Sequence, residues 1–222
     1  MTHPRRMEAC AKRTFRTSEK GRFADIRFHP HKPRYGYSFP RPFKKAASQA
    51  FPFGIASLAD EAASELSPFV DDTYRQRSEA IDVMGQMIAI PRRLHFVGLS
   101  AGSEALDQLN PASRCLVTRA TDGHLRQHAV RSVIDHQNPW VAPFVLMLLG
   151  EYVIEIVEDI RDALPVLDQS VYANFVRENR QTVQRLRARA TSYWDAYHRQ
   201  RYPQKRDYPG LQALHEMETW AA

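Results

Sequence analysis

The chain has 222 residues, of which 43% are hydrophobic and 25% are charged, and its formal net charge is +6. This composition is ordinary for a folded soluble protein. The two cysteines, Cys10 and Cys115, provide neither a disulfide framework nor a zinc-binding spacing. The longest apolar stretch without charge, residues 140–150, is too short to span a bilayer, and no apolar signal core is present at the start. We therefore expect a cytoplasmic protein without a membrane partner.

Positive charge is concentrated at the two ends of the chain. Residues 1–45 contain 13 Lys and Arg against 3 Asp and Glu, residues 46–169 contain 9 against 17, and residues 170–222 contain 9 against 5. Basic ends can attract an anionic partner, either a nucleic acid or an acidic protein surface. They can equally attract the acidic middle of the same chain or of a second copy, so a homo-oligomer is a further expectation.

Residues 1–50 are predicted to form a basic arm with little regular structure, because five prolines among them interrupt any helix. Aromatic residues recur among its cations, and such residues can stack on bases while arginines contact phosphates. The alternative interpretation is that the aromatics pin the arm to the rest of the protein. The cations that would contact a nucleic acid here are Arg13, Arg16, Arg22, Arg27, Arg34, Lys44 and Lys45.

Residues 51–222 are predicted to form a single all-α domain, an irregular helical bundle. Apolar spacing predicts helices over about 51–66 and 68–90, the second ended by Pro91. Asn110-Pro111 and Asn138-Pro139 are typical of capped helix starts, and Asp122-Gly123 separates two helices over about 111–121 and 124–136. No alternation typical of a parallel sheet is present.

A central helix is predicted over about 141–164, because this stretch is apolar around most of its circumference. We expect it to be the most buried element. A second long helix is predicted over about 170–201, and a short one over 211–220 closes the chain. The arginines of the second long helix are expected to add phosphate contacts: Arg180, Arg185, Arg187 and Arg189.

Two segments resemble known sequences. Asp122, Leu125-Arg126, Ala129 and Val133 stand at the spacing of the second helix of a HEAT repeat, and this resemblance implies a local helix pair over 111–136, or a short HEAT-like array. The stretch Ser192–Arg199, with Asp207–Gly210 after it, is similar to stretches in uncharacterised bacterial proteins and implies no particular activity. Its Tyr, Trp and Arg side chains suit a contact surface or an aromatic cluster at the edge of the core.

An enzymatic alternative comes from residues 98–102, Gly-Leu-Ser-Ala-Gly, which fit the nucleophile elbow of α/β-hydrolases. That resemblance implies a nucleophile at Ser100, with a later acid (Asp168, Asp135 or Asp159) and a later histidine (His198 or His215). The other interpretation is a crossing of two helices at small residues. The helical pattern after residue 103 disagrees with a hydrolase fold, which needs several parallel strands.

A metal site is a second alternative. His124 and His128 are four residues apart on one predicted helix, and Glu151 and Glu155 are four apart on the next, so each pair shares a face. Facing imidazoles and carboxylates can bind Zn, Mn or Fe. The competing interpretation is that the glutamates pair with arginines such as Arg126 and Arg131.

Taken together, these patterns favour a non-enzymatic interaction or scaffold protein that binds an anionic partner through its basic arm and C-terminal helix. No phosphate-binding glycine loop or dinucleotide fingerprint is present, and we expect no cofactor. A serine hydrolase that uses Ser100 and a structural subunit of a larger assembly remain the alternatives.

Overall fold

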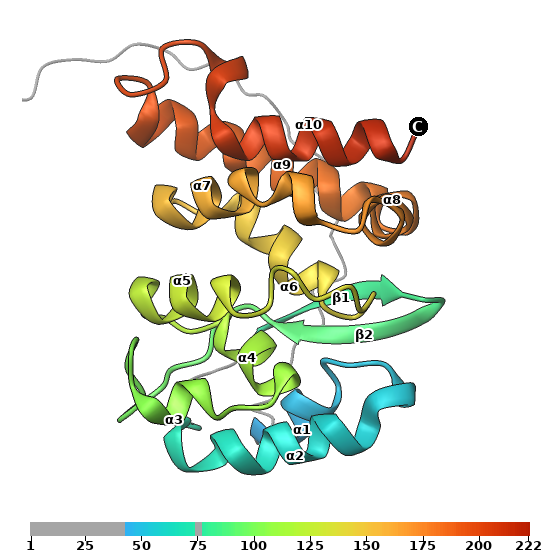
Figure 1. The fold of residues 1–222 in the computed structure, drawn as a ribbon, viewed down its shortest axis with the longest axis vertical. Helices are drawn as coiled ribbons and strands as arrows, with labels where there is room; N and C mark the ends of the chain where they lie inside the picture. The colour runs from blue at the N-terminus through green and yellow to red at the C-terminus, as the bar shows by residue number, and fades with distance from the viewer. Residues whose placement is uncertain (1–42, 74–76) are drawn as a thin grey trace, which may run out of the picture. The chain divides into compact units, whose positions relative to one another are not determined.

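Short helices make up most of the chain in a computed structural model that describes residues 43–73 and 77–222 (Figure 1). These residues belong to one unit, Tyr37–Ala222. The helices are α1 (Phe43–Ser48), α2 (Ala56–Leu66), α3 (Glu104–Asp107), α4 (Pro111–Val117), α5 (Gly123–Arg131), α6 (Ala142–Leu146), α7 (Ile154–Asp162), α8 (Gln169–Glu178), α9 (Arg180–Tyr193) and α10 (Pro209–Trp220). Within this unit, Figure 1 shows α1 and α2 at one end, α6 in the middle and α10 at the other end. The mainly helical fold is thus confirmed.

Side-chain caps begin two helices where the sequence predicts them. The Asn110 Oδ1 atom accepts a hydrogen bond from the Ser113 backbone N–H at 2.9 Å, and Asp122 Oδ1 accepts one from Leu125 at 2.8 Å. Each bond satisfies an N–H group that has no partner inside its helix. The prediction at Asn138-Pro139 is wrong, because the residue that precedes α6 is Val141 and no side chain caps that helix.

The predicted helix over 68–90 is wrong, because residues 78–91 form an antiparallel hairpin of β1 (Ser78–Val83) and β2 (Gln86–Pro91). Ile81, Val83, Ile88 and Ile90 alternate with less buried residues and face the core. In so short a run, apolar residues at every second position also match part of the spacing expected for one face of a helix. The turn at Met84-Gly85 has two positive φ angles, 56° and 74°, as a tight two-residue hairpin turn requires.

The continuous central helix predicted over 141–164 is also wrong. The chain forms α6, a 3-10 turn at η3 (Met147–Gly150), a non-helical connection at Glu151–Val153, and then α7. The expectation of deep burial is correct for its first part, since residues 141–149 are all buried. At this interruption the Glu151 carboxylate lies against the guanidinium groups of Arg93 and Arg126.

The helix predicted over 170–201 is divided at Asn179 into α8 and α9. The Asn179 side chain donates to the Asp82 carbonyl at 2.8 Å and accepts from the Asp82 backbone N–H at 2.9 Å. This pair of bonds attaches the helix junction to strand β1. Beyond α9 the chain makes a π-helical turn, η5 (Trp194–His198).

The core extends from α1 to α10, so the folded part begins earlier than residue 51. Phe43 and Ala47 of α1 are buried, and the Phe43 backbone N–H donates to Asp72 at 3.0 Å. The rest of the predicted arm, residues 1–42, lies outside the described residues.

Cys115 is fully buried in the core, and burial raises the pKa of its thiol. No helix within the described ranges is both long and apolar enough to cross a membrane.

Replacing Met84 with asparagine is expected to stabilise the protein. A left-handed conformation costs most residues about 1–2 kcal/mol, whereas asparagine adopts it readily, so Met84→Asn should raise the free energy of unfolding by about 0.5–1 kcal/mol. Urea denaturation measures this change. Met87→Asn, at an exposed position in an extended strand, is the control and should give no gain; equal gains at both sites would contradict the turn geometry.

Candidate anion-binding pocket

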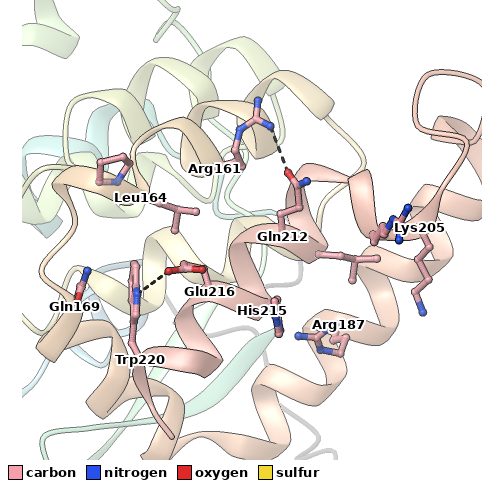
Figure 2. Close-up of a pocket in the computed structure, with 12 residues that line it drawn as sticks. Arg161, Leu164, Gln169, Arg187, Lys205, Gln212, His215, Glu216 and Trp220 are labelled. Atoms are coloured by element: carbon pink, nitrogen blue, oxygen red, sulfur yellow. Dashed lines mark hydrogen bonds between the residues drawn. The ribbon is translucent and has the colours of Figure 1, made fainter.

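A pocket of about 810 Å³ is formed by α7, α9, α10 and the segments at residues 164–169 and 205–206 (Figure 2). We call it the C-terminal pocket. Its apolar lining comes from Leu164, Pro165, Leu211 and Trp220. Its polar and charged lining comes from Arg161, Gln169, Arg187, Lys205, Arg206, Gln212, His215 and Glu216. Both its size and its mixture of apolar walls and a few polar groups are typical of small-molecule sites.

Cations outnumber carboxylates in this lining, with four Lys and Arg residues and a single acidic residue, Glu216. Three of the cations contact acidic neighbours outside the lining: Arg161 pairs with Asp162 at 2.5 Å, Arg187 pairs with Glu218, and Arg206 is 3.9 Å from Asp207. Lys205 is exposed and has no ion-pair partner among the described residues. Asp162 and Asp207 are exposed, so their pairs are weak and can be exchanged for another anion.

Helix α10 positions much of this lining. Pro209 occupies its first position, which suits proline, and Leu211, Leu214 and Met217 face the core. Gly210 packs so closely that a Cβ atom there would lie 3.2 Å from the Leu149 carbonyl oxygen. With this face fixed against the core, Gln212, His215 and Glu216 remain available to the pocket.

Two hydrogen bonds order side chains in the lining (Figure 2). Arg161 Nη1 donates to Gln212 Oε1 at 3.4 Å, which links α7 to α10. Trp220 Nε1 donates to Glu216 Oε1 at 3.2 Å, which holds the half-buried indole beside that carboxylate. The pocket thus presents an oriented aromatic ring together with several cations.

Among the predicted phosphate-contacting cations that the structure describes, only Arg187 lines the C-terminal pocket. Arg180 lies on the same side of α9 seven residues earlier and is exposed. Arg185 instead contacts Glu79 of β1 at 3.3 Å, and Arg189 lies beside Gly150. Lys44 and Lys45 are exposed on α1, and the arm cations Arg13, Arg16, Arg22, Arg27 and Arg34 lie outside the described residues.

Sequence reasoning missed Arg161, Lys205, Arg206 and Trp220, which come from three separate segments. The available signals were the pair Lys205-Arg206 between two helices and a tryptophan at the end of an amphipathic helix. Neither signal indicates a pocket without knowledge of how α7 and α10 pack.

No protein-family model matches the chain, and the comparisons with curated proteins and with solved structures gave no match.

The Tyr- and Trp-rich stretch at the end of α9 contributes to a tyrosine cluster, which comprises Tyr152, Tyr193, Tyr197, His198, Tyr202 and Tyr208. Successive ring centroids lie 6.1 Å apart from Tyr152 to Tyr193 and 6.2 Å apart from Tyr193 to Tyr197. Tyr197 is exposed, whereas Tyr208 is buried, and this burial raises the pKa of Tyr208 to about 12. The cluster therefore combines a buried anchor with an exposed aromatic edge.

The structure does not bring the hydrolase residues together. Ser100 lies in an exposed loop where Gly98 and Gly102 have positive φ angles, and this loop is neither a nucleophile elbow on a parallel sheet nor a helix crossing. The preceding residues 94–97 form isolated bridges to Ala120 and Val70. His198 contacts the Tyr152 carbonyl at 3.1 Å, and Asp168 accepts hydrogen bonds from Ser170 at the start of α8.

The four residues of the metal alternative are not brought together either. Glu151 Oε1 accepts from Arg93 Nη2 at 2.5 Å, and its Oε2 lies 3.2 Å from Arg126 Nη2, so both oxygens face guanidinium groups. His128 contacts Asp107 at 3.2 Å, whereas Glu155 is exposed on α7 and His124 is exposed on α5. Within the described residues, no three His, Cys, Asp or Glu side chains are placed to hold a metal ion.

The ion pairs of Glu151 predict a large difference between two neighbouring glutamates. Glu151 and Arg126 are each 1% exposed, so Glu151→Gln leaves buried guanidinium charge without its counter-charge and should cost about 3–5 kcal/mol of unfolding free energy. Glu155→Gln, at the exposed start of α7, should cost less than about 1 kcal/mol. Chemical denaturation measures both, and similar values for the two variants would contradict the pairing.

Proposed function

We propose that the protein is a non-enzymatic binding protein that engages an anionic partner through the C-terminal pocket, and that nucleic acid is the partner to test first. One observation carries this proposal: Arg161, Arg187, Lys205 and Arg206 come from three separate segments and converge on one pocket. Converging cations of this kind bind phosphate or carboxylate groups, since arginine offers a planar fork of donors and lysine a mobile point charge.

The aromatic side chains near these cations support a nucleic acid as the partner. Trp220 in the pocket and the exposed Tyr197 of the tyrosine cluster offer flat faces on which unpaired bases can stack. Residues 1–42 add 11 Lys and Arg against 3 Asp and Glu, and the contribution of these cations to binding stays a prediction. Such contacts are independent of base sequence and weaken as salt is added.

Reversing charge at two matched sites tests the proposal. Lys205→Glu with Arg206→Glu changes the pocket, and Lys44→Glu with Lys45→Glu makes the same charge change on exposed residues of α1. We expect the pocket variant to lose about tenfold or more in affinity for a labelled single strand of about 20 nucleotides, and to lower the slope of log affinity against log salt by about 1–1.5. Fluorescence polarisation measures both quantities.

The α1 variant is the control for the overall charge of the protein. It should change the affinity less than the pocket variant does, because Lys44 and Lys45 lie outside the pocket. Equal losses in the two variants would show that the predicted contacts of Lys44 and Lys45 or the net charge of the protein, and not the pocket, determine binding. An arm deletion in the same assay should end at residue 41, because Phe43 is part of the core.

A structural subunit of a larger assembly is the second candidate, because an exposed apolar patch surrounds the hairpin turn. Phe53, Met84 and Met87 are 87%, 63% and 70% exposed, and the Phe53 backbone N–H donates to the Gln86 side chain beside the turn at 2.9 Å. Exposed apolar side chains that cluster in this way are typical of contact surfaces. Pairing of this patch with that of a second copy would bury it around a two-fold axis.

Self-association tests this second candidate. If two copies pair through the patch, light scattering after size exclusion should give the mass of a dimer, and Met84→Ser with Met87→Ser should return it to the mass of a monomer. Val166→Ser, at another exposed apolar residue, is the control. A monomer at all concentrations, or a dimer that the double substitution leaves intact, would show that the patch does not mediate self-association.

A further inference from the structure

The C-terminal pocket is polarised along its length. Figure 2 shows Leu164, Gln169 and Trp220 toward one end and Arg187 and Lys205 toward the other, with Arg161, Gln212 and His215 between them. A purely ionic site would not need the apolar end, and a purely apolar site would not place cations at the opposite end. The two ends therefore offer different chemistry to a ligand.

We infer that the pocket binds a small organic anion in which one carboxylate or phosphate group is attached to an apolar or aromatic body. The inference rests on the proposed function in its use of the pocket cations, and it adds the identity of the ligand class. A volume of about 810 Å³ leaves room for such a body as well as for its anionic group.

The anionic group lies at the Lys205 end. Lys205 has no competing ion pair within the described part of the chain. Arg187 lies toward the same end of the pocket (Figure 2), and its pairing with Glu218 fixes the direction of its guanidinium group. A carboxylate or phosphate there meets one mobile and one oriented cation. Arg206 is only 3.9 Å from an exposed aspartate, so it is available to the same anion.

The body of the ligand lies against Trp220 and Leu164. The indole is oriented by its hydrogen bond to Glu216, so its face is fixed before a ligand binds. Glu216 is the single acidic residue of the lining, and its charge repels an anionic group at the Trp220 end. Repulsion at one end and attraction at the other determine the orientation of the ligand.

Titration calorimetry on the full-length chain tests the inference with three probes: inorganic phosphate, phenyl phosphate and phenylacetate. Phosphate and phenyl phosphate share the anionic group and differ in the body, whereas phenylacetate replaces the phosphate with a carboxylate. Phenyl phosphate should bind at least about tenfold more tightly than inorganic phosphate, because binding removes its apolar ring from contact with water. Comparison of phenyl phosphate with phenylacetate identifies which anionic group the pocket prefers.

Four variants separate the two ends. Trp220→Ala should abolish the preference for phenyl phosphate and leave the affinity for inorganic phosphate unchanged, and Trp220→Phe should retain the preference if the alanine variant is unstable. Lys205→Gln should weaken all three probes by a similar factor. Val97→Ala, at an exposed apolar residue outside the lining, should behave as the unmodified protein.

Two results would overturn the inference: equal affinity for inorganic and phenyl phosphate, or no binding of any probe. In either case the proposed function is decided separately by the oligonucleotide measurement. If Lys205→Glu with Arg206→Glu still weakens the oligonucleotide selectively, the pocket cations bind a polymer and only the inference on the ligand class fails. If that variant also has no effect, both fail.

Discussion

Every element after residue 150 follows an interruption of helical structure at which the Glu151 carboxylate is buried against two arginines. This carboxylate joins Arg93, which follows strand β2, and Arg126 of α5 to the turn after α6. Burial of such charges is expensive unless they are paired, and one carboxylate here lies against two guanidinium groups. If the helix continued through residues 150–153, the direction of the Glu151 side chain would be fixed by its position in that helix. The chain instead becomes extended at Glu151, where φ is −111° and ψ is 165°.

A second buried arginine adds to this constraint. Arg119, which follows α4, is 1% exposed and donates to the Phe144 carbonyl at 3.4 Å, so it attaches α4 to α6. Burial lowers the pKa of its guanidinium, and Glu151 opposes that shift. Because the chain leaves Glu151 in a new direction, α7 packs against α10, and Arg161 reaches Gln212. The C-terminal pocket is thus formed by segments that all follow the interruption.

Local signals in the sequence predicted those features that depend on residues close together in the chain. Asn110 and Asp122 cap their helices, residues 141–149 are buried, and the closing helix ends at Trp220. The hairpin was missed because the apolar residues of 78–91 fit two periods, and Met84-Gly85 lacks the usual turn asparagine. Glu151 is an acidic residue within an apolar run, and the sequence allowed two interpretations of it: a metal ligand or an ion-pair partner of an arginine such as Arg126. The pocket could not be predicted, because its cations come from segments that only the packing of α7 on α10 brings together.

A double-mutant cycle between Glu151 and Arg126 tests most directly whether this buried ion pair determines the fold after α6. The free energies of unfolding of Glu151→Gln, Arg126→Gln and the double variant give the coupling between the two side chains. We predict that the double variant is more stable than the sum of the single losses implies, by about 1.5–3 kcal/mol, because the second substitution removes a charge that the first leaves unpaired. Additive losses would show that the two groups do not interact, and the ion pair could then not be the reason why the chain is interrupted after α6.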